Sequence, residues 1–287
     1  MEDKENGQMH TLSRILKLWR VHAWLDFIFA TRSLRLFAIN YISDGVLSIA
    51  SVSSTLLLAA RFDGIGPWRL PQILFMLGYA MTVTGLLSML FGYNVLYIGR
   101  RLGRGQLDHT LIQPQPIWMA LLTEGFNPFL GSISLLTGIV MLWWGFNQLQ
   151  QPASIGWVIT LLISLVASAV VMLAFNFIWG SLAFWAPRGA EEINSPLIDM
   201  FAQLKGYPLD GLGSLMMGGL LIALPVGFVA WLPCRALLGL TDQPLDVLAT
   251  PLAALFFSAL AILIFRRGLR HYMQVGSRRY HDMGHRR

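Results

Sequence analysis

The chain has 287 residues, of which 55% are hydrophobic and only 13% are charged, and its formal net charge is +6. Soluble domains carry about 25% charged residues, so this composition excludes an ordinary soluble enzyme, and its hydrophobicity excludes a disordered chain. The single cysteine, Cys234, excludes a disulfide framework and a cysteine zinc cage. With a mean hydropathy of +0.58, the remaining class is an integral membrane protein.

The first predicted element is an amphipathic helix at residues 11–31. One face of it is apolar (Leu12, Ile15, Leu16, Trp19, Ala23) and another is basic (Arg14, Lys17, Arg20). Such a helix lies in the headgroup layer of a membrane, with its basic side chains toward anionic lipid. Its role is either simple anchoring or a mechanical one.

Long stretches with few charges predict six membrane-spanning helices after it. We place them at 36–60, 72–98, 126–146, 154–178, 211–233 and 249–266. The charge-free run 125–187 is divided at 147–152, where four amides and a proline are unfavourable in hydrocarbon. The runs are too long for barrel strands and lack their alternation. The predicted fold is therefore an all-α integral membrane protein.

The distribution of basic residues orients these spans. With the N-terminus inside, 18 of the 21 Lys and Arg residues are cytoplasmic, and only Arg61, Arg69 and Arg235 lie outside. The positive-inside rule therefore places both termini in the cytoplasm. The expected parts are an N-terminus with the interfacial helix (1–35), a transmembrane domain (36–266) and a basic tail (267–287). Because the basic excess follows topology and no nucleic-acid-binding motif accompanies it, we expect no nucleic-acid partner.

Polar residues in the first span share one helix face (Asn40, Asp44, Ser48, Ser51, Thr55). A carboxylate within the membrane is costly, so it faces the protein interior or a cavity. One hypothesis is that this face forms a wall of a translocation path. The alternative is that the hydroxyl residues pack against other helices and Asp44 lies near the headgroups.

Two cytoplasmic segments have helical character. The 99–116 loop is basic and glycine-containing, and it has a short helical stretch with a proline stop, which suits docking on a soluble partner. In 187–210 an apolar stripe (Ile193, Leu197, Met200, Phe201, Leu204) accompanies acidic residues (Glu191, Glu192, Asp199). We expect this segment to lie on the cytoplasmic membrane surface.

No catalytic motif is present in the sequence. There is no Walker A glycine-lysine motif, no H-E-x-x-H and no G-x-S-x-G elbow. His271, His281 and His285 are interpreted as solvated tail residues rather than metal ligands. We therefore expect no catalytic residues, no metal site and no cofactor bound by this chain.

The 99–116 loop also carries a family resemblance. Residues 105–114 read G-Q-L-D-H-T-L-I-Q-P, and the order continues with Phe184-Trp185, Tyr207-Pro208, the 224–233 stretch L-P-V-G-F-V-A-W-L-P and Leu237-Leu238-Gly239. The chain thus resembles the membrane-spanning subunits of ABC-2-type transporters, in the group labelled as domain of unknown function DUF990. Gln113 replaces an arginine that is frequent before that proline in the family.

This resemblance implies a type V exporter-like permease of a prokaryotic cytoplasmic (inner) membrane. It implies a second permease, identical or homologous, and two copies of an ABC ATP-binding subunit that hold ATP and Mg²⁺. The 99–116 loop would be the coupling helix. Its expected ATPase-coupling residues are Gly105, Leu107, Asp108, Leu111, Ile112 and Pro114, with Asp108 alternatively only capping a local helix. The alternatives are a stand-alone secondary transporter, which usually shows inverted repeats, and a membrane-embedded enzyme, which needs an intramembrane polar catalytic set.

Overall fold

The computed structural model describes residues 2–96, 107–113, 116–241, 243 and 245–275, and these residues are mostly helical. The α-helices are α1 (Glu2–Arg32), α2 (Leu34–Phe62), α3 (Leu70–Leu96), α5 (Leu107–Leu111), α6 (Ile117–Thr123), α7 (Ser132–Leu149), α8 (Ile155–Gly180), α9 (Pro187–Leu204), α10 (Ser214–Ile222), α11 (Trp231–Leu237) and α12 (Asp246–Val275). Two 3₁₀ turns, η1 (Ser181–Phe184) and η2 (Val226–Phe228), and a hairpin of β1 (Gly64–Ile65) and β2 (Trp68–Arg69) complete the fold.

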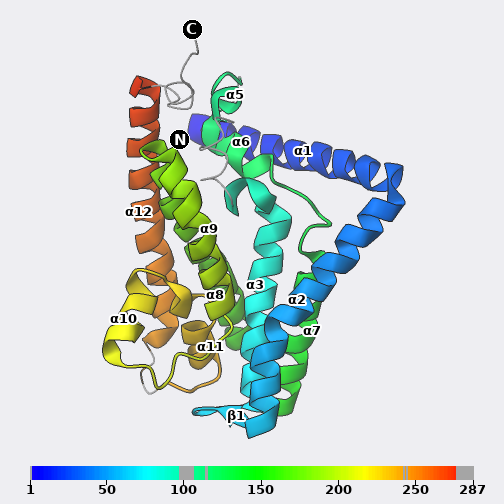
Figure 1. The fold of residues 1–287 in the computed structure, drawn as a ribbon, viewed down its shortest axis with the longest axis vertical. Helices are drawn as coiled ribbons and strands as arrows, with labels where there is room; N and C mark the ends of the chain where they lie inside the picture. Colours follow the sequence, from blue (N-terminus) through cyan, green and yellow to red (C-terminus); the bar gives the residue numbers. More distant parts are fainter. Residues whose placement is uncertain (1, 97–106, 114–115, 242, 244, 276–287) are drawn as a thin grey trace.

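The long helices form an elongated bundle with distinct ends (Figure 1). Helix α1 lies across one end, together with α5, α6 and the C-terminal end of α12. Helix α2 descends obliquely from α1 to the β1–β2 hairpin, which lies at the opposite end with α10 and α11. We call these the α1 end and the hairpin end. The N-terminal helix and the end of α12 therefore share one end of the bundle.

Helix α3 is the centre of the core, and it packs antiparallel against α7 through glycines. Glycines recur at a spacing of seven residues on both helices: Gly78 and Gly85 on α3, and Gly138 and Gly145 on α7. A Cβ atom on Gly138 would lie 2.5 Å from the backbone nitrogen of Thr82. The two backbones therefore touch, as small residues allow in membrane helix packing.

Five of the six predicted spans correspond to single long helices. Helices α2, α3, α7, α8 and α12 overlap the predictions at 36–60, 72–98, 126–146, 154–178 and 249–266. Helix α7 begins later than expected because the preceding residues form turns, in which the Asn127 side chain accepts hydrogen bonds from the Phe129 and Leu130 N–H groups. By length and apolarity, four described helices can cross a membrane, or five if one bent pair counts as a span.

The predicted fifth span at 211–233 is not a single straight helix, because this stretch is broken. Helix α10 and the segment 226–237 meet at a bend of 70°. Pro225 lies at the break, where it lacks the N–H that a continuous helix needs. Both pieces lie at the hairpin end (Figure 1).

The predicted placement of 187–210 on the cytoplasmic surface is also wrong. Helix α9 instead runs alongside α8 toward the hairpin end (Figure 1). Phe201 from its apolar stripe stacks on Phe175 of α8, with ring centroids 4.4 Å apart. Three residues beyond the helix, Tyr207 reaches Ser54 on α2, with 3.0 Å between the hydroxyl oxygens. Phe201 of the stripe is therefore buried against protein, whereas Ile193 and Met200 of the same stripe remain exposed.

The predicted N-terminal helix is confirmed and is longer than expected. Trp19, assigned to the apolar face, stacks on Phe126 with ring centroids 5.1 Å apart, and its indole N–H donates to the Leu122 carbonyl at 3.4 Å. These contacts hold α1 against α6 and the turns that follow it. The later part of α1 exposes Val21, Trp24, Leu25, Phe27 and Ile28.

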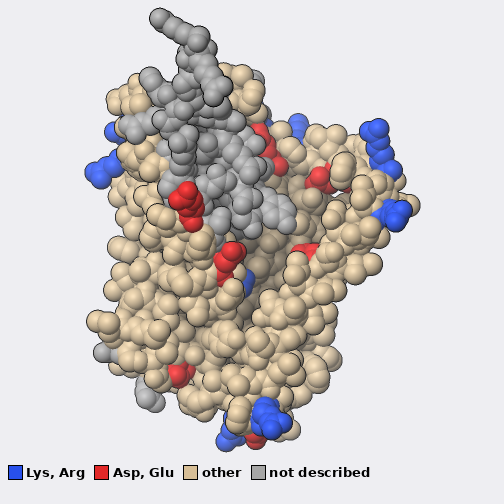
Figure 2. All heavy atoms as spheres, viewed as in Figure 1, with Lys and Arg blue, Asp and Glu red and all other residues tan. Residues whose placement is uncertain are grey.

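Between the two ends, the outer surface of the bundle is largely apolar. On the face in Figure 2, most Lys and Arg side chains lie near the ends, and the surface between them is mostly uncharged apart from scattered acidic side chains and a basic one in the hollow. Exposed apolar side chains on long helices include Ile42, Val46, Leu162, Ile163, Leu255 and Phe256. Such a surface is unfavourable in water and matches the hydrocarbon layer of a bilayer.

Candidate functional site

The predicted polar face of α2 borders two cavities. Asn40 and Asp44 line them, and Thr55 is buried farther along the helix, with an exposure of only 1%. Ser48 is half-buried, and Ser51 is exposed and donates its hydroxyl back to the Ser48 carbonyl at 2.7 Å. The structure thus turns Asp44 and Thr55 toward the protein, leaves Asn40 exposed at the elbow cavity, and pairs the Ser51 hydroxyl with its own helix.

The larger cavity, which we call the elbow cavity, has a volume of about 480 Å³. It lies where α1 meets α2, and residues 127–130 close it from the other side. Its polar lining comprises Asp26, Ser33, Asn40, Tyr41, Ser43, Asp44 and Asn127. On α1, burial raises the pKa of Asp26, and the charge of His22 opposes this rise. Because no basic side chain lines it, the elbow cavity suits groups that donate hydrogen bonds or carry positive charge.

The smaller cavity, the inner cavity, has a volume of about 210 Å³. It shares Asp44 and Leu130 with the elbow cavity, so the two adjoin. Its other polar residues are Thr84 and Ser88 from α3, Asn176 from α8 and Lys205 from the end of α9. Met172, Phe175, Ile198 and Phe201 supply apolar walls. The hollow opens between α9 and α2 on the face seen in Figure 2.

Lys205 is the most informative residue of the inner cavity. Its ammonium donates a hydrogen bond of 2.6 Å to the Thr84 hydroxyl, which lies near the midpoint of α3. Placing a lysine at the middle of a membrane span costs about 3 kcal/mol, and such residues face cavities and serve function. Sequence reasoning missed Lys205 because the segment 187–210 was assigned to the cytoplasm. The signal that could have found it is its position four residues after the buried Phe201.

Two acceptor atoms beside this ammonium lack donors. The Asn176 amide nitrogen donates to the Met172 carbonyl at 2.8 Å. Among the residues that the structure describes, no donor reaches its amide oxygen or the Oδ2 oxygen of Asp44. Asn176 has an exposure of only 3%. Buried acceptors normally have partners, so these atoms indicate room for a hydrogen-bond donor in the inner cavity.

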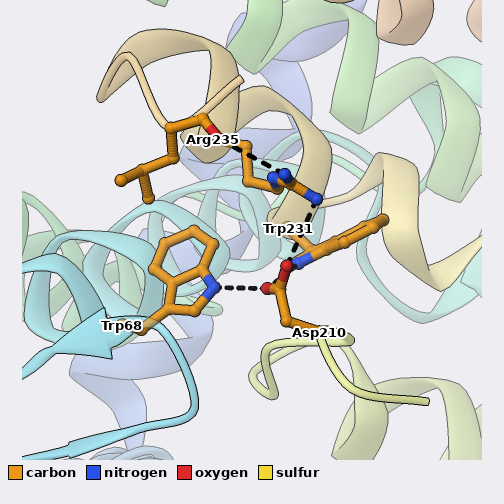
Figure 3. Close-up of polar contacts among 5 residues, drawn as sticks. Trp68, Asp210, Trp231 and Arg235 are labelled. Atoms are coloured by element: carbon orange, nitrogen blue, oxygen red, sulfur yellow. Dashed lines mark hydrogen bonds and ion pairs between the residues drawn. The ribbon is translucent and has the colours of Figure 1, made fainter. Parts of the chain in front are cut away.

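A second polar group, the outer cluster, closes the hairpin end (Figure 3). Asp210 accepts hydrogen bonds from the indole N–H groups of Trp68 and Trp231, the latter at 2.6 Å. Its other oxygen pairs with the Arg235 guanidinium at 3.2 Å, and Arg235 also donates to the Leu240 carbonyl. The cluster thereby joins β2, the loop after α9 and α11. It fixes the broken segment against the bundle.

The predicted coupling residues lie partly in α5. Leu107, Asp108 and Leu111 belong to this helix, which confirms the expected short helix at the α1 end. Ile112 follows it and is 81% exposed, as a docking contact requires. Gly105 and Pro114 lie outside the described residues.

Metal binding finds no support in the described ranges. Among those residues, no group of three or more His, Cys, Asp or Glu side chains could hold a metal ion. His271 lies against the Trp185 ring, with centroids 6.1 Å apart, whereas His281 and His285 fall outside the described residues. The candidate site is formed by the elbow and inner cavities, which adjoin at Asp44 and Leu130.

Comparisons with known proteins agree with this geometry. A family model described as "ABC-2 family transporter protein" matches residues 46–276, which include the outer cluster and the residues lining the inner cavity except Asp44. Comparison with curated proteins and comparison with solved structures give no match.

Proposed function

Because the chain belongs to the ABC-2 transporter family and is thus a multi-pass permease, we propose that it is the permease subunit of an ATP-driven exporter in a prokaryotic cytoplasmic membrane. The family match over 46–276 supports the permease part of this proposal, and the direction of transport and the type of membrane are its further steps. Two permeases, identical or homologous, would act with two ABC ATP-binding subunits. ATP and Mg²⁺ would bind those partners, since this sequence has no Walker A motif.

We propose that five helices, α2, α3, α7, α8 and α12, cross the membrane, and that α9 together with the loop after it makes a sixth crossing. Their directions alternate between the α1 end and the hairpin end (Figure 1), and α10 and α11 would enter and leave from the hairpin end. Arg61, Arg69 and Arg235 belong to elements of the hairpin end, whereas Arg266, Arg267 and Arg270 lie near the end of α12. This distribution supports a cytoplasmic α1 end and cytoplasmic termini.

The groove between α2 and α9 is our candidate for the translocation path. Asn40 and Asp44 line cavities there, Thr84 and Lys205 lie midway, and Tyr207 with Ser54 continues toward the outer cluster. Polar groups at successive depths would replace part of the hydration of a passing substrate. A second permease would cover the open side of this groove.

Purification of the tagged chain in mild detergent from its native host, with mass spectrometry of what accompanies it, tests the proposal. An ATP-binding protein in near-equal amount is expected, and another permease beside it would indicate a heterodimer. A folded chain that repeatedly purifies alone, and that transports or turns over substrate without ATP, would instead favour a secondary transporter or a membrane enzyme.

Asp108→Arg is expected to weaken binding of the ATP-binding subunit by about tenfold or more, since it reverses a charge in the proposed coupling helix. Pull-down with increasing salt and ATP hydrolysis by the complex would measure this loss. The control is Glu192→Arg, which makes the same charge change at an exposed position on α9. Equal binding by wild type and Asp108→Arg would remove Asp108 from the interface and leave it a local helix cap.

Cysteine labelling tests whether the groove holds water. In sealed vesicles, Ser88→Cys, which lines the inner cavity, is expected to react with a membrane-impermeant maleimide, because only a hydrated thiol forms the reactive thiolate. Val46→Cys is expected to remain unlabelled, although Val46 is 60% exposed, because it would face lipid. Cys234 is fully buried and gives little background. Labelling of Val46→Cys but not of Ser88→Cys would contradict this path.

A further inference from the structure

We propose that the inner cavity binds a zwitterionic group, with its anionic part on Lys205 and its ammonium toward Asp44 and Asn176. This inference rests on the proposed function, because it names the substrate class for the same groove. The sites of opposite charge are contributed by different helices, α2 and the end of α9. A ligand that contacts both sites would link α2 to the end of α9 across the inner cavity.

The anionic subsite follows from Lys205. An ammonium has three donors, and the structure gives this one a single partner among the described residues, the Thr84 hydroxyl. That partner is neutral, so this hydrogen bond does not balance the charge of the ammonium. An anionic ligand oxygen would accept the remaining protons and form a charge-assisted hydrogen bond, which is about twice as strong as a neutral one.

The cationic subsite follows from the opposite wall. Asp44 Oδ2 and the Asn176 amide oxygen are buried acceptors that receive no hydrogen bond from any described group. Both residues line the inner cavity together with Lys205. An ammonium would donate to these oxygens and also balance the carboxylate charge. A purely anionic ligand would satisfy Lys205 but would leave the Oδ2 oxygen of Asp44 without a donor.

The volume of the inner cavity and the exposed surface beside it indicate how much of the ligand enters the cavity. Drug-sized ligands occupy pockets of about 300–1,000 Å³, so the inner cavity of about 210 Å³ holds a head group rather than a whole amphiphile. The adjoining elbow cavity continues to the exposed side of α2, where its lining residue Leu47 is 69% exposed. An acyl chain attached to the zwitterion would therefore lie along α2. The same cavity would also take a free soluble zwitterion.

The experiment uses the full chain in detergent and lysophosphatidylethanolamine labelled on its acyl chain. The wild type is expected to bind this probe at least about tenfold more tightly than labelled lysophosphatidylglycerol, which lacks the ammonium. Lys205→Gln is expected to weaken binding of both probes by about tenfold, and Lys205→Arg to restore much of it. Asp44→Asn is expected to abolish the preference for the zwitterion.

Competition with soluble phosphoethanolamine separates the sources. Displacement at concentrations near those of the unlabelled lysolipid indicates a soluble zwitterion, and much weaker displacement indicates a lipid-like one. Arg61→Gln, at the hairpin end of α2, is the control and leaves both affinities unchanged. Equal wild-type affinities for the two probes, or affinities that Lys205→Gln and Asp44→Asn leave unchanged, overturn the inference. Copurification of the ATP-binding subunit is measured separately. The proposed transporter function can therefore hold even if the inference of a zwitterion site is wrong.

Discussion

Gly138→Ala is expected to lower the free energy of unfolding by about 3 kcal/mol, although it adds one methyl group. The new Cβ would lie 2.5 Å from the Thr82 nitrogen, 2.8 Å from its Oγ1 and 2.9 Å from the Gly78 carbonyl oxygen. Two of these three atoms belong to backbone, so a rotamer change cannot relieve the clash. Helices α3 and α7 must therefore move apart, and the core around α3 loosens with them.

Gly156→Ala is the matched control, because Gly156 also lies in a long helix and its Cβ would meet only the Ser154 hydroxyl, at 3.9 Å. We expect it to be neutral or stabilising by up to about 1 kcal/mol, since alanine favours helices over glycine. The apparent unfolding midpoint in detergent, followed by size-exclusion chromatography after heating, measures both. Equal midpoints for Gly138→Ala and wild type would show that α3 and α7 do not make this close contact.

The same interface shows what hydropathy can predict and what it cannot. Charge-free runs predict α2, α3, α7, α8 and α12 because the cost of burying charge in hydrocarbon depends mainly on composition. Which helices touch depends on shape. Gly78 and Gly85 are seven residues apart in α3, as are Gly138 and Gly145 in α7, but only the fold shows that these glycines face each other.

Helix α9 marks the limit of the prediction. Its apolar stripe and flanking acids are typical of a helix on a membrane surface, and they equally suit a helix that borders a polar groove. Tertiary contacts distinguish these two positions: Phe201 stacks on Phe175, and Lys205 donates a hydrogen bond to Thr84. Phe175 and Thr84 lie outside 187–210, so the sequence of this segment alone does not predict these contacts.

The candidate site was predicted only in part for the same reason. Asp44 stands out because a carboxylate inside an apolar run is rare. Asn176 sits in a similar run without charge, and its significance comes from an unpaired oxygen that depends on neighbouring helices. The inner cavity draws residues from five parts of the chain, so no single motif could reveal it.

Asp210→Asn is expected to destabilise the protein by about 3 kcal/mol and to loosen the broken segment at the hairpin end. The carboxylate serves three donors: the indole N–H groups of Trp68 and Trp231 and the Arg235 guanidinium. Asparagine keeps one acceptor oxygen but turns the other position into a donor that faces donors. Trp68 and Trp231 have exposures of only 1% and 3%, so water cannot replace the lost acceptor.

The control is Asp63→Asn, the same substitution at an exposed turn whose φ of 54° asparagine tolerates well. Unfolding midpoints in detergent and proteolysis of the 211–245 stretch are the measurements. Asp210→Asn should fall well below wild type and expose new cleavage sites, whereas Asp63→Asn should match it. Combining Asp210→Asn with Arg235→Gln should lower the free energy of unfolding by less than the sum of the single effects. The double variant no longer has a guanidinium without its carboxylate partner. Strict additivity would mean that Asp210 and Arg235 do not interact, and the outer cluster would then not be what holds the bent segment in place.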